Sequence, residues 1–130
     1  MQIAYDPDAP PEFQYTVSPH SLPRKAAVDA MRNWCAPEEL SAFAVARHGF
    51  MNSDSFFGIT YPTDLDEWDR ASGESIPDGY VEALAGYGDP HSDGLLILEA
   101  EYLELLRQFL LLVRLPTHAQ ELATVIEKGG

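Results

Sequence analysis

The residues with the widest catalytic chemistry in this 130-residue chain are four histidines and one cysteine. An imidazole transfers protons or binds a metal near neutral pH, and a thiolate is a strong nucleophile. The histidines, His20, His48, His91 and His118, are far apart and form no HExxH, HxH or CxxC pattern. Metal sites need several ligands at characteristic spacings, so the sequence predicts neither a metal site nor a bound cofactor.

Cys35 would be a nucleophile if the fold brought His48 or His91 close to its thiol. It follows Trp34 at the end of an amphipathic helical pattern, however, where a lone cysteine usually serves as a small buried hydrophobic residue. We therefore expect Cys35 to be structural. The sequence has no phosphate-binding glycine motif, and no spacing singles out a pair of carboxylates for hydrolysis. The chain is thus predicted not to be an enzyme, with a hydrolase of unrecognised type as an alternative.

The acidic segment 64–69 has the alternating carboxylates of a calcium-binding loop. Trp68 occupies a ligand position in that alignment, the following glycine is missing, and the twelfth residue is Ser75 where a glutamate is needed. We interpret the segment as the acidic face of a short helix.

Net charge is the strongest global feature of the chain. Twenty-one acidic residues against eight lysines and arginines give a net charge of −13. Such a field repels nucleic acids and anionic lipids and attracts basic proteins. The total charge agrees equally well with a basic protein partner and with a role in solubility alone. The distribution of the charge along the chain decides between these two interpretations.

Twelve acidic residues between Asp64 and Glu104 are opposed by one arginine, Arg70. This concentration costs self-repulsion in the free protein, which favours a basic protein partner. Trp68 and Tyr80 in this stretch are expected in the core and Tyr87 at the surface. The alternative is that these aromatic residues are interface anchors among the steering charges. The predicted contact residues are nine acids and one tyrosine: Asp64, Asp66, Glu67, Asp69, Glu74, Asp78, Glu82, Tyr87, Asp89 and Asp93.

The most apolar stretch, residues 94–115, should form the centre of the core. The continuous apolar run Leu95–Leu98 is typical of a buried strand, and a helical pattern begins at Glu99. Leu106 and Phe109 lie on the broad apolar arc of this helix, so we expect both in the core.

Polarity patterns and caps around this centre predict an α+β fold. Asp6-Pro7 and Pro10-Pro11 predict that residues 1–11 form an extended N-terminal arm. Residues 80–87 favour a strand because glycines flank them, with a helix as the alternative. The predicted order is βααβαββαα, a small antiparallel or mixed sheet with helices packed on one face, in one domain of residues 1–130. Strands are expected at 13–17, 56–61, 80–87 and 95–98, and helices at about 21–35, 37–48, 63–72, 99–115 and 117–128.

The expected location is the cytoplasm. The N-terminus lacks the basic and apolar regions of a signal peptide, and no apolar run is long enough to span a membrane. A single cysteine excludes an internal disulfide, which agrees with a reducing compartment.

Three motifs between Trp68 and Leu112 point to a family: Ile76-Pro77-Asp78-Gly79-Tyr80-Val81-Glu82, Gly86-Tyr87-Gly88 and Glu99-Ala100-Glu101-Tyr102-Leu103. In these motifs the chain resembles small immunity proteins encoded beside bacterial polymorphic toxins. The resemblance implies a compact cytosolic inhibitor, often acidic, that plugs the active site of a toxin. It implies no individual residue roles.

The predicted function is therefore a non-enzymatic protein that neutralises a basic partner, a bacterial toxin domain, acting as a monomer or weak dimer. The alternative is an acidic cytosolic secretion chaperone for an effector protein. Chaperones that this chain resembles in size and acidity usually begin with a helix and dimerise. The extended arm and strand predicted here favour the toxin inhibitor instead.

Overall fold

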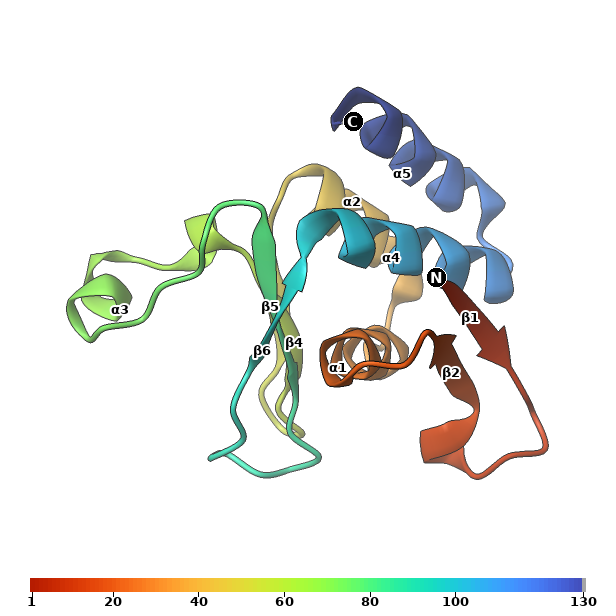
Figure 1. The fold of residues 1–130 in the computed structure, drawn as a ribbon, viewed down its shortest axis with the longest axis horizontal. Helices are drawn as coiled ribbons and strands as arrows, with labels where there is room; N and C mark the ends of the chain where they lie inside the picture. The colour runs from red at the N-terminus through yellow and green to blue at the C-terminus, as the bar shows by residue number, and fades with distance from the viewer. Residues whose placement is uncertain (130) are drawn as a thin grey trace.

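The computed structural model describes residues 1–129 and confirms an α+β fold (Figure 1). A two-stranded antiparallel sheet pairs β1 (Gln2–Tyr5) with β2 (Tyr15–Ser18). The second sheet is antiparallel in the order β3 (Phe50–Asn52), β4 (Phe57–Thr60), β5 (Tyr80–Ala85) and β6 (Leu95–Leu98). The helices are α1 (Leu22–Arg32), α2 (Leu40–Val45), α3 (Glu67–Ala71), α4 (Glu99–Leu112) and α5 (Pro116–Gly129).

Two strands are present that the predicted order lacks. β1 lies within the segment expected as an extended arm, where Ile3 is buried and pairs opposite Val17 of β2. β3 is only three residues long and forms a hairpin with β4, with Phe50 as its buried residue. Strands this short carry almost no alternating pattern of their own, so pairing with a distant or adjacent strand is what fixes them.

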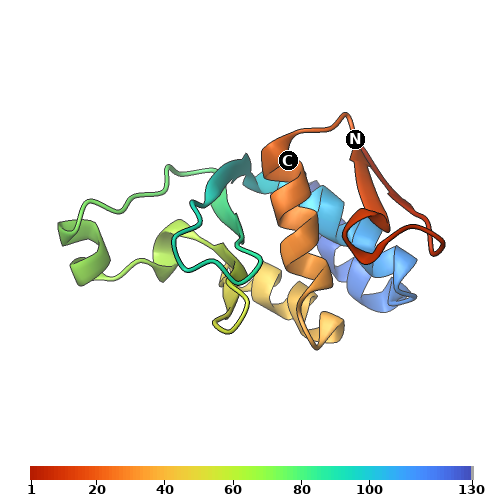
Figure 2. The ribbon, with the colours of Figure 1, turned by 90° about the horizontal axis from the view of Figure 1, so that it is seen from below.

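Helices α1 and α4 pack on one face of the four-stranded sheet, as predicted. α1 lies directly against β4, β5 and β6, and α4 lies beside α1 (Figures 1 and 2). Three small residues of α1, Ala26, Ala27 and Ala30, are buried, which lets the helix approach the sheet closely. The β1–β2 hairpin packs against α1 and α4 on the side away from that sheet. α1 is therefore the buried central layer of the molecule.

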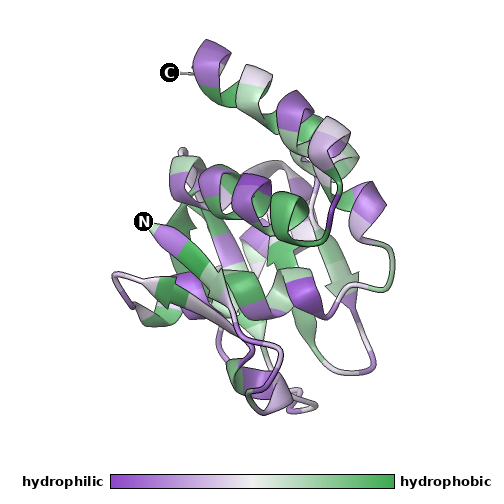
Figure 3. Cartoon of the chain, turned by 90° about the vertical axis from the view of Figure 1, so that its right-hand side faces the viewer, coloured by the Kyte–Doolittle hydropathy of each residue, from purple (hydrophilic) through white to green (hydrophobic). Residues whose placement is uncertain are grey.

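α4 forms the core that its sequence pattern predicts. Leu106 is fully buried and Phe109 is 3% exposed, so both are core residues as expected. α4 also packs along α5, and hydrophobic and hydrophilic residues alternate along both helices (Figure 3). The strand before α4 and the strand Tyr80–Ala85 also agree with their predicted positions.

Within residues 1–129, no helix packs on the opposite face of the four-stranded sheet (Figure 1). Because strand side chains alternate between faces, β5 directs Val81 and Ala83 toward α1 and Glu82 outward. Met51, Leu96 and Leu98 also lie on this outward face and are 43%, 42% and 45% exposed. We call the outward-facing side chains of β3 to β6 the open sheet face.

Candidate partner-binding surface

The chain leaves the sheet after β4 and returns to it at β5, and residues 62–79 between them form a projecting segment, here called the α3 arm. It extends away from α1 and α4, on the side of the open sheet face (Figures 1 and 2). α3, a single short helix near the tip, contributes no buried residue to the molecule. α3 is therefore a protrusion and not part of the core, while Ile76 on the return to β5 is buried.

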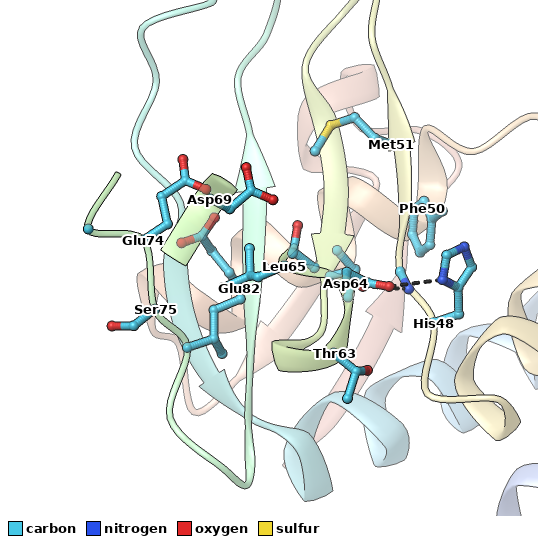
Figure 4. A pocket seen from close by; sticks show the side chains of 15 residues that line it. His48, Phe50, Met51, Thr63, Asp64, Leu65, Asp69, Glu74, Ser75 and Glu82 are labelled. Atoms are coloured by element: carbon cyan, nitrogen blue, oxygen red, sulfur yellow. Dashed lines mark hydrogen bonds and ion pairs between the residues drawn. The ribbon is translucent and has the colours of Figure 1, made fainter. Parts of the chain in front are cut away.

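Asp64 fixes the base of the α3 arm. Its Oδ2 accepts hydrogen bonds from the backbone N–H groups of Gly49 (2.8 Å) and Tyr61 (2.7 Å). Its Oδ1 lies 2.8 Å from Nδ1 of His48 (Figure 4). A Cβ on Gly49 would lie 2.0 Å from the carbonyl oxygen of Ile59, so only glycine permits this approach of β3 to β4. Both carboxylate oxygens of Asp64 are thus engaged within the protein.

The tip of the arm is held by a reciprocal capping box. Asp66 accepts from the backbone N–H of Asp69 (2.8 Å), and Asp69 accepts from that of Asp66 (3.1 Å). These bonds satisfy donors at the start of α3 and fix its first turn. The predicted contact residues Asp66 and Asp69 therefore shape the arm as well as charge it.

Trp68, expected in the core, is 78% exposed, so that prediction was wrong. α3 has only five residues and projects away from the open sheet face, so no apolar layer reaches its side chains (Figure 1). The local sequence pattern predicted that Trp68 lies on the apolar face of a short helix. Such a face is buried only where another element packs against it.

A hollow of about 920 Å³ separates the α3 arm from the open sheet face (Figure 4). The sheet contributes Met51, Thr60 and Glu82, and the arm contributes Asp69 and Glu74. Burial, and then the charges of Glu74 and Asp93, raise the pKa of the Glu82 carboxyl. The hollow therefore concentrates negative charge over a partly apolar floor.

Ion pairing divides the twelve acids of 64–104 into two groups. On α4, Glu99 pairs with Arg47 (3.1 Å), Glu104 pairs with Arg107 (2.5 Å), and Glu101 pairs with Arg24. Asp64 pairs with His48 as described above. The other eight form no ion pair with any residue of 1–129: Asp66, Glu67, Asp69, Glu74, Asp78, Glu82, Asp89 and Asp93.

All eight of these acids belong to the predicted contact set. The structure gathers six of them on the α3 arm and the adjoining β5: Asp66, Glu67, Asp69, Glu74, Asp78 and Glu82. Asp93 lies close enough to Glu82 to raise the pKa of that carboxyl. Asp89 lies in the β5–β6 loop, where its Oδ1 accepts from the N–H of His91 (2.9 Å), away from the hollow.

Tyr87, like Asp89, is a predicted contact residue that the structure places apart from the hollow. Its ring is 55% exposed, as expected for a surface residue, and stacks edge-on against Phe57 at 4.9 Å. Its hydroxyl, however, bonds to Asp29 of α1, on the helix-covered side of the sheet. Tyr87 thus ties the β5–β6 loop to α1.

Sequence reasoning missed the apolar part of this surface. Leu96 and Leu98 were expected to be buried, because Leu95–Leu98 is uniformly apolar and such a run is typical of a strand covered on both faces. Only one face of β6 is covered, so Ile97 is buried and its neighbours are exposed. Nothing in a uniformly apolar run indicates which of its residues face outward.

The catalytic candidates do not assemble into a nucleophilic site among residues 1–129. Cys35, expected to be buried, is exposed, because α1 ends at Arg32 and Cys35 lies in the turn beyond it. His118 Nδ1 lies 3.0 Å from Ser41 Oγ and 4.0 Å from a Glu121 oxygen. A Ser–His–acid triad uses the two different ring nitrogens, and Ser41 is buried, so this contact is helix packing.

Across the described chain, no group of three or more His, Cys, Asp or Glu side chains is arranged to hold a metal ion. No helix within residues 1–129 has both the length and the apolar character needed to cross a bilayer. Comparison with protein-family models, curated proteins and solved structures gives no match. The charge and geometry of the α3 arm and the open sheet face are the features that point to a function.

Proposed function

We propose that this protein binds and neutralises a basic protein, and that the partner is a bacterial toxin domain whose active site it blocks. One observation carries the proposal: eight acids without an ion pair in residues 1–129, most of them on the α3 arm and the sheet beside it. In the free protein these charges repel one another. A partner that supplies lysines and arginines relieves that repulsion.

The paired acids of α4 support the same assignment. Glu99, Glu101 and Glu104 have arginine partners within the fold, so their charge is already compensated. The acids at the tip and on the return of the arm form no ion pair within residues 1–129, not even with Arg70, which lies in the same arm. Their negative charge is therefore uncompensated. Charge of one sign on a protruding segment steers a partner of the opposite sign toward it.

Two of the three motifs that resemble immunity proteins border the same region. Ile76–Glu82 is the return of the α3 arm into β5, and Glu99–Leu103 is the start of α4. In this proposal the protein acts in the cytosol of the toxin-producing cell and has no catalytic activity of its own.

The test is binding to a basic secreted protein encoded by the adjacent gene, purified as a catalytically inactive variant. Exposed charges are screened beyond ~8–10 Å at physiological ionic strength. We expect association to slow by about tenfold or more between low and physiological salt, with dissociation nearly unchanged. The active form of the same protein should lose its activity at one equivalent of this chain.

Two results would contradict the proposal. A salt-independent association rate would exclude steering by the arm acids. Binding that leaves the enzyme fully active would exclude neutralisation, and would instead favour the secretion chaperone, which holds an effector without blocking it.

A further inference from the structure

We propose that Trp68 anchors the partner, and that the docking surface consists of the α3 arm together with the open sheet face. The occupant is a basic cleft of the partner protein, into which the arm inserts. This inference rests on the proposed function. It adds the apolar residues that stabilise the complex after the acidic charges have steered the two proteins together.

Trp68 is the most exposed large apolar side chain of the described residues, at 78%. Tryptophans contribute disproportionately to binding because they bury a large rigid area with few rotatable bonds. A tryptophan at the tip of a charged protrusion therefore has the chemistry of an interface anchor.

The arm presents Trp68 in a fixed geometry. The Asp66–Asp69 capping box holds the start of α3, and Ser72 Oγ donates to the carbonyl oxygen of Trp68 at 3.0 Å. Asp64 fixes the base of the arm to the sheet. A preorganised segment loses little conformational entropy on binding, which favours tight association.

The open sheet face supplies a second apolar area on the same side of the molecule. Met51, Leu96 and Leu98 each expose more than 40% of their surface there. Glu74 and Glu82 lie at the hollow between this face and the arm. Apolar side chains bordered by charged ones are the usual composition of a protein–protein interface.

Charge identifies the occupant. The arm carries Arg70 against six acids: Asp64, Asp66, Glu67, Asp69, Glu74 and Asp78. A second copy of the chain would bring the same acids against one another, and like charges across an interface cost several kcal/mol. The complementary partner is basic, and a protruding arm fits a concave site.

Fluorescence tests the anchor directly. Trp34→Phe leaves Trp68 as the single tryptophan, and the change keeps an aromatic ring beside Phe43 and Phe50. The probe is the inactive basic protein from the adjacent gene. Binding should shift Trp68 emission to shorter wavelength and protect it from acrylamide, a neutral quencher that the acids do not repel.

Affinity provides the second readout. Trp68→Ala should weaken binding by about thirtyfold or more, as expected for an interface hot spot. Phe13→Ala is the matched control, because Phe13 is an aromatic residue, 55% exposed, that lies just before β2. The β1–β2 hairpin lies at the opposite end of the molecule from α3 (Figure 1). Phe13→Ala should leave affinity unchanged, and both variants should melt as the parent does because neither side chain is in the core.

The outcomes separate this inference from the proposed function. If Trp68→Ala binds normally, or Trp68 stays accessible to acrylamide in the complex, the anchor is refuted. If neutralising the arm acids still weakens binding in that case, the proposed function stands without the anchor. If neither change affects the complex, both proposals fail.

Discussion

The hydroxyl of Tyr87 donates a 2.5 Å hydrogen bond to Oδ2 of Asp29, joining residues 58 positions apart. Asp29 is 2% exposed and also accepts from Lys25 (3.1 Å) and Arg32 (3.2 Å), both on α1. A buried carboxylate is stable only when its oxygens are satisfied, and among residues 1–129 Tyr87 supplies the one side-chain partner from outside the helix. Burial and the bond to Asp29 raise the pKa of the Tyr87 hydroxyl.

Tyr87→Phe should lower the free energy of unfolding by about 1.5–3 kcal/mol, since it removes a hydrogen bond to a charged group and retains the ring. Urea denaturation measures the change. Tyr5→Phe is the control, because the Tyr5 hydroxyl has no hydrogen-bond partner among residues 1–129 and should cost almost nothing. Equal stability of the two variants would show that the Tyr87–Asp29 bond does not contribute.

Leu106→Ala or Phe109→Ala should each cost about 2–5 kcal/mol, because both side chains are buried in the packed core of α4. Chemical denaturation of the two variants gives the values. Leu111→Ala, on the same helix but 47% exposed, should cost well under half as much. A loss of unfolding free energy for Leu111→Ala as large as that for Leu106→Ala or Phe109→Ala would mean that α4 buries a different face.

Glu82→Gln should stabilise the protein at neutral pH by a small amount, of the order of 0.5 kcal/mol, since Glu82 is only partly buried. Burial and the charges of Glu74 and Asp93 raise its folded-state pKa, so the folded state binds the proton more tightly than the unfolded state. Ionised Glu82 therefore destabilises the fold above that pKa, and the penalty disappears as pH falls below the pKa of the unfolded chain.

The measurement for Glu82 is the difference in unfolding free energy between variant and parent across the acid range. It should approach zero at low pH and reach its full value near neutrality. A difference that is constant with pH would exclude titration of Glu82 as its cause.

Changing four arm and loop acids together should weaken partner binding by about tenfold or more while stability is retained. The substitutions are Asp66→Asn, Glu67→Gln, Asp78→Asn and Asp89→Asn. A second quadruple variant removes the same number of charges from exposed acids elsewhere: Glu12→Gln, Glu38→Gln, Asp54→Asn and Glu127→Gln.

Because both quadruple variants have the same net charge, only the position of the charge differs between them. Isothermal titration calorimetry at fixed salt compares their affinities. Equal losses would show that total charge, and not the α3 arm, governs binding.

Cys35→Ala combined with His91→Ala should leave partner neutralisation intact, because both side chains are exposed and neither lies at the hollow. The exposed Cys35 thiol should also react with a disulfide reagent in the native protein as fast as in urea. Loss of neutralisation in a folded double variant that still binds its partner would instead indicate catalytic chemistry.

Features that depend on local periodicity could be read from the sequence. The strand Leu95–Leu98 and the helix from Glu99 lie at their predicted positions, and Leu106 and Phe109 are buried. A continuous apolar face on a helix is buried in the core whichever element covers it, so its burial follows from the sequence pattern alone. The concentration of acids in residues 64–104 is likewise a property of the sequence alone.

Features that depend on what covers a side chain were decided only by the tertiary structure. Trp68 and Cys35 are exposed because α3 projects beyond the sheet and α1 ends before Cys35, and neither fact follows from an apolar pattern. Arg24 and Arg47 neutralise Glu101 and Glu99 from 77 and 52 positions away, so sequence distance gave no indication of which acids remain unpaired. Burial and ion pairing are contacts between distant segments, and the folded chain alone brings those segments together.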